Sequence, residues 1–188
     1  MTIVLMHTET VIAYLGLGSN LGDRAGNLLL AVRGLLEAHI CVTRLSAVYE
    51  TEPFGVVKQS PFLNMVAEAH VNSISAEQML ARMLRIEYLL GRRRESAEKA
   101  PRTVDLDLLL FGSLQHKTDL LTVPHPLLHL RNFALVPFAE IAPYAVHPTF
   151  NKTIRELLKK SLDSSKVQRW QPRLHSGLDF QISDYKTA

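Results

Sequence analysis

Two aspartates in i, i+2 spacing, Asp105 and Asp107, form the sharpest chemical signal in the chain. Residues 103–111 are otherwise strongly apolar and predict a β-strand, on which both carboxylates face the same side. Strict alternation puts Leu110 on the opposite face and Phe111 beside the acids. Like charges this close raise each other's pKa unless a cation intervenes, and Mg²⁺ typically uses one or two carboxylates plus substrate phosphates. The alternative is a solvent-facing strand end whose acids pair with arginine.

A cationic segment precedes these acids. Residues 82–102 hold six arginines and one lysine against three glutamates, with Arg92, Arg93 and Arg94 in a row and Arg102 three residues before Asp105. Metal ligands beside guanidinium groups suit phosphoryl transfer, which depends on positioning and charge neutralisation. We expect a nucleotide-phosphate site here; the alternative is a solvated arginine-rich loop.

Other candidates are weaker when taken singly. Glu87 falls within the apolar stripe of a predicted helix, where a carboxylate needs a partner. His125 stands between two prolines, whose fixed φ angles restrict its direction, and Arg131 follows six residues later. Phe62 and Asn64 share one face of a predicted strand, a pairing that suits a flat heterocycle. For each of them an ordinary structural role is the alternative.

A glycine-rich turn, GLGSNLG from Gly16, follows a predicted strand and precedes a helix. The third glycine of a dinucleotide fingerprint would fall at position 21, which is Leu. This departure disfavours a Rossmann site, although a Rossmann-type oxidoreductase stays an alternative. A tight turn that lets the backbone approach a site is the favoured interpretation, because glycine has no Cβ.

These residues need six elements to position them. Strands are expected at residues 11–18, 41–51, 62–71 and 103–111, and helices at residues 24–38 and 75–90, begun by Asp23 and by a Ser75–Gln78 capping box. The order βαββαβ predicts a ferredoxin-like α+β sandwich, with helices packed on an antiparallel sheet. Further on, we expect a short strand at 121–123, a helix at 132–141 and a last helix from Asn151 to about residue 162.

Composition limits the alternatives. The chain has 188 residues, 47% hydrophobic and 21% charged, with a formal net charge of +3. A lone cysteine, Cys41, excludes an internal disulfide or a cysteine-rich zinc site, and no apolar run approaches a membrane span. We expect a cytoplasmic protein with neither membrane nor nucleic acid as partner; monomer and homodimer both stay open. A base-stacking RNA-binding module is the competing non-enzymatic hypothesis, but the two acids on the sheet argue against it.

Several segments together resemble one known family. They are LGLGSNLGDR, YETEPFG, FLN, RIEYLLGRRR, APRTVDLDLLLF and VPHPLLHLRNFAL, in this order. The chain is similar, from about residue 11 to residue 148, to the 2-amino-4-hydroxy-6-hydroxymethyldihydropteridine pyrophosphokinases. We expect residues 1–148 to form the catalytic domain and residues 149–188 an extension of unknown role.

The resemblance implies an activity and a set of roles. It implies transfer of diphosphate from ATP to 6-hydroxymethyl-7,8-dihydropterin in folate biosynthesis, with AMP as the other product and two Mg²⁺ ions held by Asp105 and Asp107. Asp107 is also a candidate proton acceptor, and Arg92 and Arg102 would neutralise the transferred group. The implied pterin contacts are Thr51, Phe54, Phe62, Asn64 and Phe133, and the implied nucleotide contacts are Glu87, Arg92, Arg94, Arg102, His125 and Arg131.

Four positions depart from the commoner family pattern: Glu52, Leu84, Lys99 and Ala100. They bear on loop geometry and on contacts to adenine more than on the metal site.

Overall fold

An antiparallel sheet forms the centre of the molecule. The computed structural model describes residues 10–52, 59–92 and 100–172. The strands of the main sheet lie in the order β10-β3-β4-β1-β5, and β2 pairs with a further stretch of β4. Their bounds are β1 Val11–Ser19, β2 Cys41–Leu45, β3 Tyr49–Thr51, β4 Phe62–Val71, β5 Asp105–Phe111 and β10 Val167–Arg169. Every pairing in it is antiparallel, so the Rossmann alternative, which needs a parallel sheet, was wrong.

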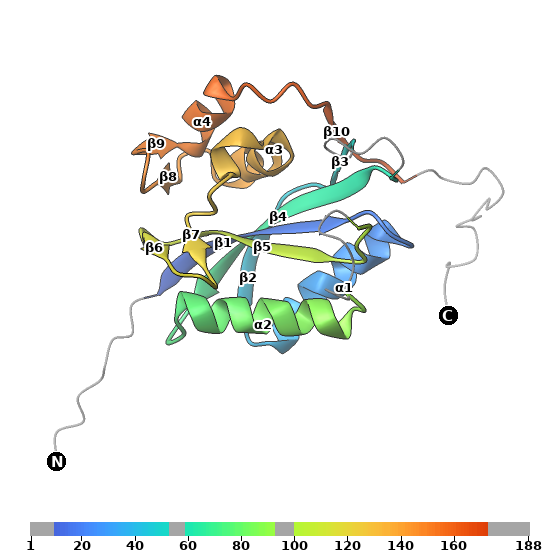
Figure 1. The fold of residues 1–188 in the computed structure, drawn as a ribbon, viewed down its shortest axis with the longest axis horizontal. Helices are drawn as coiled ribbons and strands as arrows, with labels where there is room; N and C mark the ends of the chain where they lie inside the picture. Colours follow the sequence, from blue (N-terminus) through green and yellow to red (C-terminus); the bar gives the residue numbers. More distant parts are fainter. Residues whose placement is uncertain (1–9, 53–58, 93–99, 173–188) are drawn as a thin grey trace, which may run out of the picture.

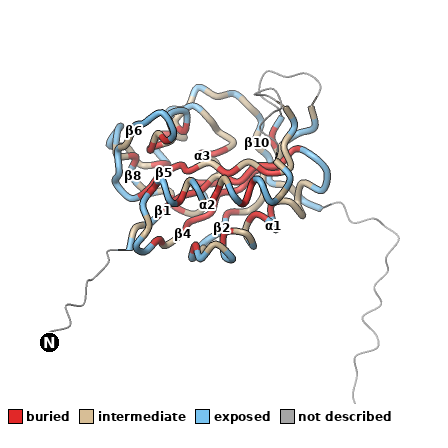
Figure 2. Tube along the Cα trace, turned by 60° about the horizontal axis from the view of Figure 1, so that its bottom comes forward, coloured by how far each residue is buried: buried red, intermediate tan, exposed pale blue. Residues whose placement is uncertain are grey.

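Two helices cover one face of this sheet, α1 (Arg24–Glu37) and α2 (Ala76–Leu89) (Figure 1). The side chain of Asp23 caps α1 by accepting from the Gly26 amide, and Ser75 and Gln78 form the expected capping box of α2. Alternate residues of the strands point between sheet and helices and form the larger core, visible as the buried strands in Figure 2. The order βαββαβ and the sheet topology confirm the predicted ferredoxin-like α+β fold.

The opposite face of the sheet is covered only in part, by α3 (Asn132–Ile141) and α4 (Ile154–Lys160) (Figure 1). Their apolar residues pack on Tyr14, Val66 and Leu110, which form a second core cluster around the fully buried Phe138. Smaller elements complete this side: the β6–β7 hairpin (His116–Lys117 and Thr122–Val123), the 3₁₀ turn Leu128–Leu130, and the β8–β9 hairpin (Val146–His147 and Lys152–Thr153).

The expected alternation along β5 was wrong at its end. A register shift between Tyr14 and Leu15 pairs Leu110 with Tyr14, so Leu110 joins the α3 side and Phe111 joins the core under α1 and α2. A bulge leaves one extra residue in the strand and reverses the faces beyond it. The two aspartates precede the shift and keep their common face.

Two other boundaries differ from expectation. The single strand expected at residues 41–51 is two strands, because Ser46 turns its hydroxyl to accept from the Val66 amide. The last helix begins at Ile154 instead of Asn151, since Thr153 and Glu156 form a capping box, and it ends at Lys160. Asn151 has φ 49° and belongs to the turn between β8 and β9. That hairpin spans residue 148, and the expected division of the chain there stays a prediction.

Candidate active site

The uncovered part of the second sheet face carries the acids. Asp105 of β5 lies opposite Gly18 of β1, which lies opposite Asn64 of β4, so the three form one row across the sheet. Asp107 lies opposite Gly16 in the next row. A Cβ added to Gly18 would stand 3.1 Å from Asn64 Oδ1 and 3.8 Å from both Asp105 Cβ and Phe62 Cδ1. The space above Gly18 is therefore where an acid, an amide and an aromatic ring converge.

Asp105 is held by two guanidinium groups. Arg92 and Arg102 each donate to one of its carboxylate oxygens, and Arg92 also donates to Glu87. The side chains of Asp105 and Arg92 are only 20% and 16% exposed, so this ion pair is largely shielded from solvent. Sequence reasoning left open a metal site or arginine pairing for the acids, and for Asp105 the structure shows the arginine pairing.

Glu87 lies beneath this network. It is 1% exposed, and its Oε1 accepts from the Leu106 amide at 2.8 Å as well as from Arg92. A buried carboxylate is stable only with such partners. The expectation that Glu87 lies in the apolar stripe of α2 and needs a partner is confirmed. Its predicted contact with a nucleotide stays a prediction.

Asp107 is in a different state. Within the described ranges its carboxylate forms no hydrogen bond or ion pair. Burial and the neighbouring charge of Asp105 raise its pKa to about 6, although Arg131 and Arg92 act in the opposite direction. Such a carboxylate gains from a cation placed against it.

The donor set constrains which metal could bind. Among the described residues no three His, Cys, Asp or Glu side chains gather closely enough to hold an ion. Two carboxylates fit Mg²⁺ when phosphate oxygens and water complete the shell, whereas a structural zinc site needs about four protein ligands. The residues present therefore fit a magnesium ion that arrives with a phosphate ligand.

His125 and Arg131 lie at the same site. Burial and the charge of Arg131 lower the pKa of His125 to about 4, so the ring is neutral at pH 7. The Leu127 amide donates to His125 Nδ1 at 3.2 Å, which leaves the proton on Nε2. His125 therefore offers an N–H donor, not a charge. The guanidinium of Arg131 lies 5.6 Å from the ring centre of Phe133, the predicted pterin contact at the start of α3.

The remaining predicted pterin contacts adjoin β3. Thr51 lies opposite Phe62 in the β3–β4 ladder, and the Asn64 amide donates to Thr51 Oγ1 at 2.7 Å. Thr51 and Asn64 are 4% and 6% exposed. Phe54 and Arg94 lie outside the described residues, as does Lys99, one of the departures from the family pattern.

Asn20 and Gln59 belong to the site and were missed. Asn20 is 2% exposed, and its Oδ1 accepts from the Arg102 amide at 2.7 Å while its Nδ2 donates to Gln59 Oε1 at 3.2 Å. Asn20 thus joins the segment before β5 to the segment before β4. A polar residue inside the glycine-rich segment was the available signal, but the partners of Asn20 lie 82 and 39 residues away in sequence.

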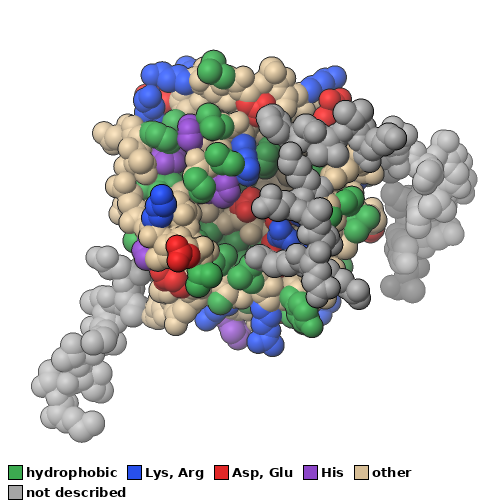
Figure 3. Space-filling view, in the orientation of Figure 1, with side chains coloured by type: hydrophobic (Ala, Val, Ile, Leu, Met, Phe, Trp, Pro, Cys, Tyr) green, Lys and Arg blue, Asp and Glu red, His purple; other side chains and the backbone are tan. Residues whose placement is uncertain are grey.

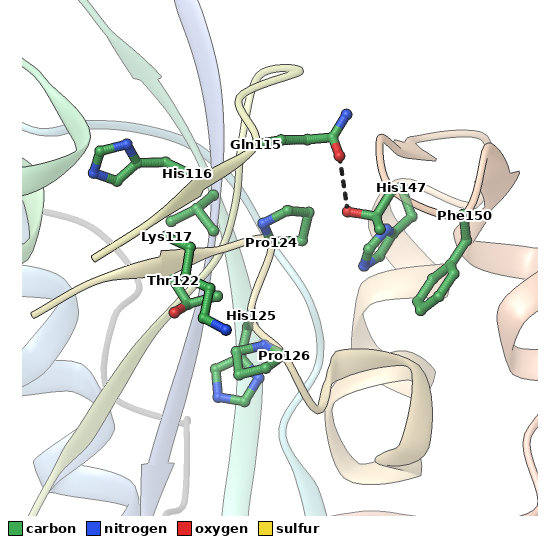
Figure 4. A pocket seen from close by; sticks show the side chains of 11 residues that line it. Gln115, His116, Lys117, Thr122, Pro124, His125, Pro126, His147 and Phe150 are labelled. Atoms are coloured by element: carbon green, nitrogen blue, oxygen red, sulfur yellow. Dashed lines mark hydrogen bonds between the residues drawn. The ribbon is translucent and has the colours of Figure 1, made fainter. Parts of the chain in front are cut away.

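A cavity of about 370 Å³ adjoins the site (Figure 4). It lies between the β6–β7 hairpin, the Pro124–Pro126 turn and the β8–β9 turn. At its edge the Thr149 hydroxyl donates to Gln115 Oε1 at 3.4 Å. His125 is the residue that this cavity shares with the site, and the described residues that line the cavity include no aspartate or arginine. Charged and polar groups converge at the acids and not in this cavity, which makes the acids the candidate active site. Figure 3 shows acidic, basic and histidine side chains close together near the middle of the face in view.

Fold and site together define an α+β protein with paired carboxylates and guanidinium groups arranged for phosphoryl chemistry on the free face of a ferredoxin-like sheet. Residues 14–143 match the model of the family described as 7,8-dihydro-6-hydroxymethylpterin-pyrophosphokinase (HPPK). The chain belongs to this family.

Individual relatives support the same family assignment. The chain is 40% identical to the 2-amino-4-hydroxy-6-hydroxymethyldihydropteridine pyrophosphokinase of Bacillus subtilis, over 89% of this chain and 94% of the relative. It is 38% identical to the enzyme of that name from Aquifex aeolicus, over 76% and 88%. Wild-type Plasmodium falciparum HPPK-DHPS, solved with pterin and p-hydroxybenzoate, has a similar fold, with TM-score 0.65 and 19% identity over 82% of this chain. This chain spans 44% of the length of that one. No helix in the described part of the chain is long and apolar enough to cross a bilayer.

Proposed function

We propose that this protein transfers diphosphate from ATP to the hydroxymethyl group of 6-hydroxymethyl-7,8-dihydropterin, with AMP and the pterin diphosphate as products, in folate biosynthesis. Its family and its relatives of the same activity support the reaction. The observation that carries it to particular residues is the convergence of Asp105, Asn64 and Phe62 above Gly18. An acid for a metal-bound phosphate and an amide with an aromatic ring for a heterocycle lie within one small space.

The pterin side of the proposed site is built from β3 and β4. Phe62 and Phe133 would enclose the ring. Asn64 donates to Thr51 and keeps its Oδ1 turned to the space above Gly18, where it can accept from an amino group of the pterin. Burial of the amide makes this selective, because a ligand that lacks the matching donor leaves a buried oxygen unpaired.

The phosphate side is formed by the arginines. Arg92 and Arg102 already lie on Asp105, so they need little movement to reach phosphate oxygens, and Glu87 holds Arg92 from beneath. Arg131 and the Nε2–H of His125 add a charge and a neutral donor. Preorganised donors of this kind stabilise charge that develops during transfer.

Asp105 and Asp107 are proposed to hold Mg²⁺ together with the phosphates, two ions being expected. Magnesium in this place would neutralise phosphate charge and lower the pKa of the attacking hydroxyl. Asp107 has a raised pKa and no hydrogen-bond or ion-pair partner among the residues that the structure describes, which suits it to accept a proton from that hydroxyl. The hydroxyl would attack the β-phosphorus, and AMP would leave.

Turnover tests this proposal. Protein, Mg²⁺, ATP and the hydroxymethyl pterin should together yield AMP, and ADP or no nucleotide product would contradict it. Asp105→Ala and Asp107→Ala should each lower kcat about 10³-fold or more, as expected when several kcal/mol of metal-borne stabilisation is lost. Asp119→Ala, which removes an exposed acid from the loop before β7, is the matched control and should keep full activity.

A further inference from the structure

Arg24 begins α1 and reaches toward the pterin side of the proposed site. Its Nη1 donates to Glu50 Oε1 at 2.8 Å and to the Pro61 carbonyl at 2.6 Å. The Arg24 side chain is 24% exposed and that of Glu50 is 38% exposed. One guanidinium nitrogen therefore joins a residue of β3 to the residue just before β4.

These two partners stand at the two ends of one connection. Glu50 directly precedes Thr51, and Pro61 directly precedes Phe62; Thr51 and Phe62 face each other across the ladder. The connection between them contains residues 53–58, which lie outside the described part of the chain. Arg24 consequently fixes the distance between the two strands where the pterin contacts begin.

The backbone ladder between these two strands is short. β3 has only three residues, and a ladder so short allows small shifts of register or spacing. The Asn64–Thr51 hydrogen bond lies inside the site, where a ligand competes for the same groups. Arg24 acts from outside, and its charge-assisted hydrogen bonds are stronger than neutral ones.

We infer that Arg24 is a positioning residue for pterin binding: it holds the ends of β3 and β4 so that Thr51, Phe62 and Asn64 keep the spacing of the ring site. Arg24 does not touch the ring itself. This inference rests on the proposed function, since it concerns the substrate that the proposed site takes. It assigns a role to Arg24, the last residue of the GLGSNLGDR segment, and to its partner Glu50.

Steady-state kinetics test the inference through a selective effect. Arg24→Met keeps much of the side-chain length and removes both hydrogen bonds, to Glu50 and to the Pro61 carbonyl. It should raise KM for the pterin about tenfold, because the ends of the two strands are then no longer held together. KM for ATP and kcat should stay within about twofold of the wild-type values, because the variant leaves the arginines and aspartates of the phosphate side unchanged. Arg24→Lys, which keeps a charged donor, should recover most of the affinity, and Glu50→Gln should show a smaller rise.

Arg33→Met is the matched control, since Arg33 lies on the same helix in an exposed pair with Glu37. It should leave both KM values unchanged. An unchanged pterin KM in Arg24→Met would overturn the inference. So would equal losses in kcat, both KM values and Tm, because they would indicate a general structural role.

Amide hydrogen exchange separates this inference from the proposed function. Arg24→Met should speed exchange at Thr51 and Asn64, whose amides face each other's strand in the β3–β4 ladder, relative to the wild type, while amides in the middle of β1 stay protected. If the wild type forms no AMP, the proposed function fails, and the exchange rates still decide whether Arg24 holds the two strands. Equal exchange in variant and wild type would refute the inference.

Discussion

At the scale of single residues, the two aspartates share a motif but differ in physical state. Asp105 is paired with Arg92 and Arg102, whereas burial and the charge of Asp105 raise the pKa of Asp107 to about 6. Neighbours explain the difference, because both arginines reach the first carboxylate and neither contacts the second. A buried carboxylate with no ion-pair partner in the described part of the chain is expected to destabilise the ligand-free fold.

Asp107→Asn should therefore stabilise the ligand-free protein and abolish its activity. A pKa raised from 3.8 to about 6 favours the folded state below pH 3.8, and that advantage is lost as pH rises through about 6. The full shift corresponds to about 3 kcal/mol, which partial exposure reduces to about 1–2 kcal/mol. Denaturant unfolding in EDTA should show this gain at pH 7 and little gain at pH 4. Asp119→Asn should show none, and a lower stability of Asp107→Asn at pH 7 would contradict the explanation.

At the scale of elements, α3 is attached to the sheet through a buried acid. Glu68 of β4 is 3% exposed and accepts from Tyr14, Thr43 and Arg44, and Arg44 also donates to the carbonyl of Ile141, the last residue of α3. Burial alone would raise the pKa of Glu68, but these hydrogen bonds lower it overall. Burial and Glu68 raise the pKa of Tyr14 to about 12. The position of α3 matters for the proposed site, because Arg131 and Phe133 lie at the start of this helix.

Glu68→Gln should loosen this attachment. Removing one partner of a buried charged network costs about 2–4 kcal/mol, measured as the free energy of unfolding in urea at pH 7. A lowered pKa means that the contribution is present above the ordinary value of 4.5 and is lost as pH falls through the folded value. The difference between variant and wild type should therefore shrink near pH 3. Glu37→Gln, in an exposed pair, is the control, and an equal effect of both variants would argue against the role of Glu68.

At the scale of the whole molecule, the chain past residue 162 returns to the sheet. β10 pairs with β3, with Val167 opposite Thr51, and the Trp170 amide donates to the Val48 carbonyl at 2.8 Å while its ring packs against the main core. The C-terminal strand thus covers the free edge of β3. This pairing gives part of the extension of unknown role a structural function, next to the pterin side of the proposed site.

Trp170→Ala should weaken that edge. Loss of a partly buried aromatic ring is expected to cost about 1–2 kcal/mol, seen as a lower Tm by circular dichroism. Leu162→Ala, at a residue that is 96% exposed in the preceding segment, should leave Tm unchanged. A wild-type Tm in Trp170→Ala would show that the strand contributes nothing to stability.

Local sequence determined most of the elements of this protein. Caps at Asp23 and Ser75, alternation along β4 and the i, i+2 spacing of the acids depend on neighbours in sequence, and each was confirmed. The family segments likewise lie along single stretches of chain. Only tertiary structure decided that Asp105 pairs with arginine, that a bulge reverses the end of β5, and that Asn20 and Arg24 join distant segments. The contacts of Asp105 with Arg92, of Asn20 and of Arg24 cross 13 to 82 residues of sequence. No periodicity or spacing rule covers such a separation, because packing of the whole chain sets it.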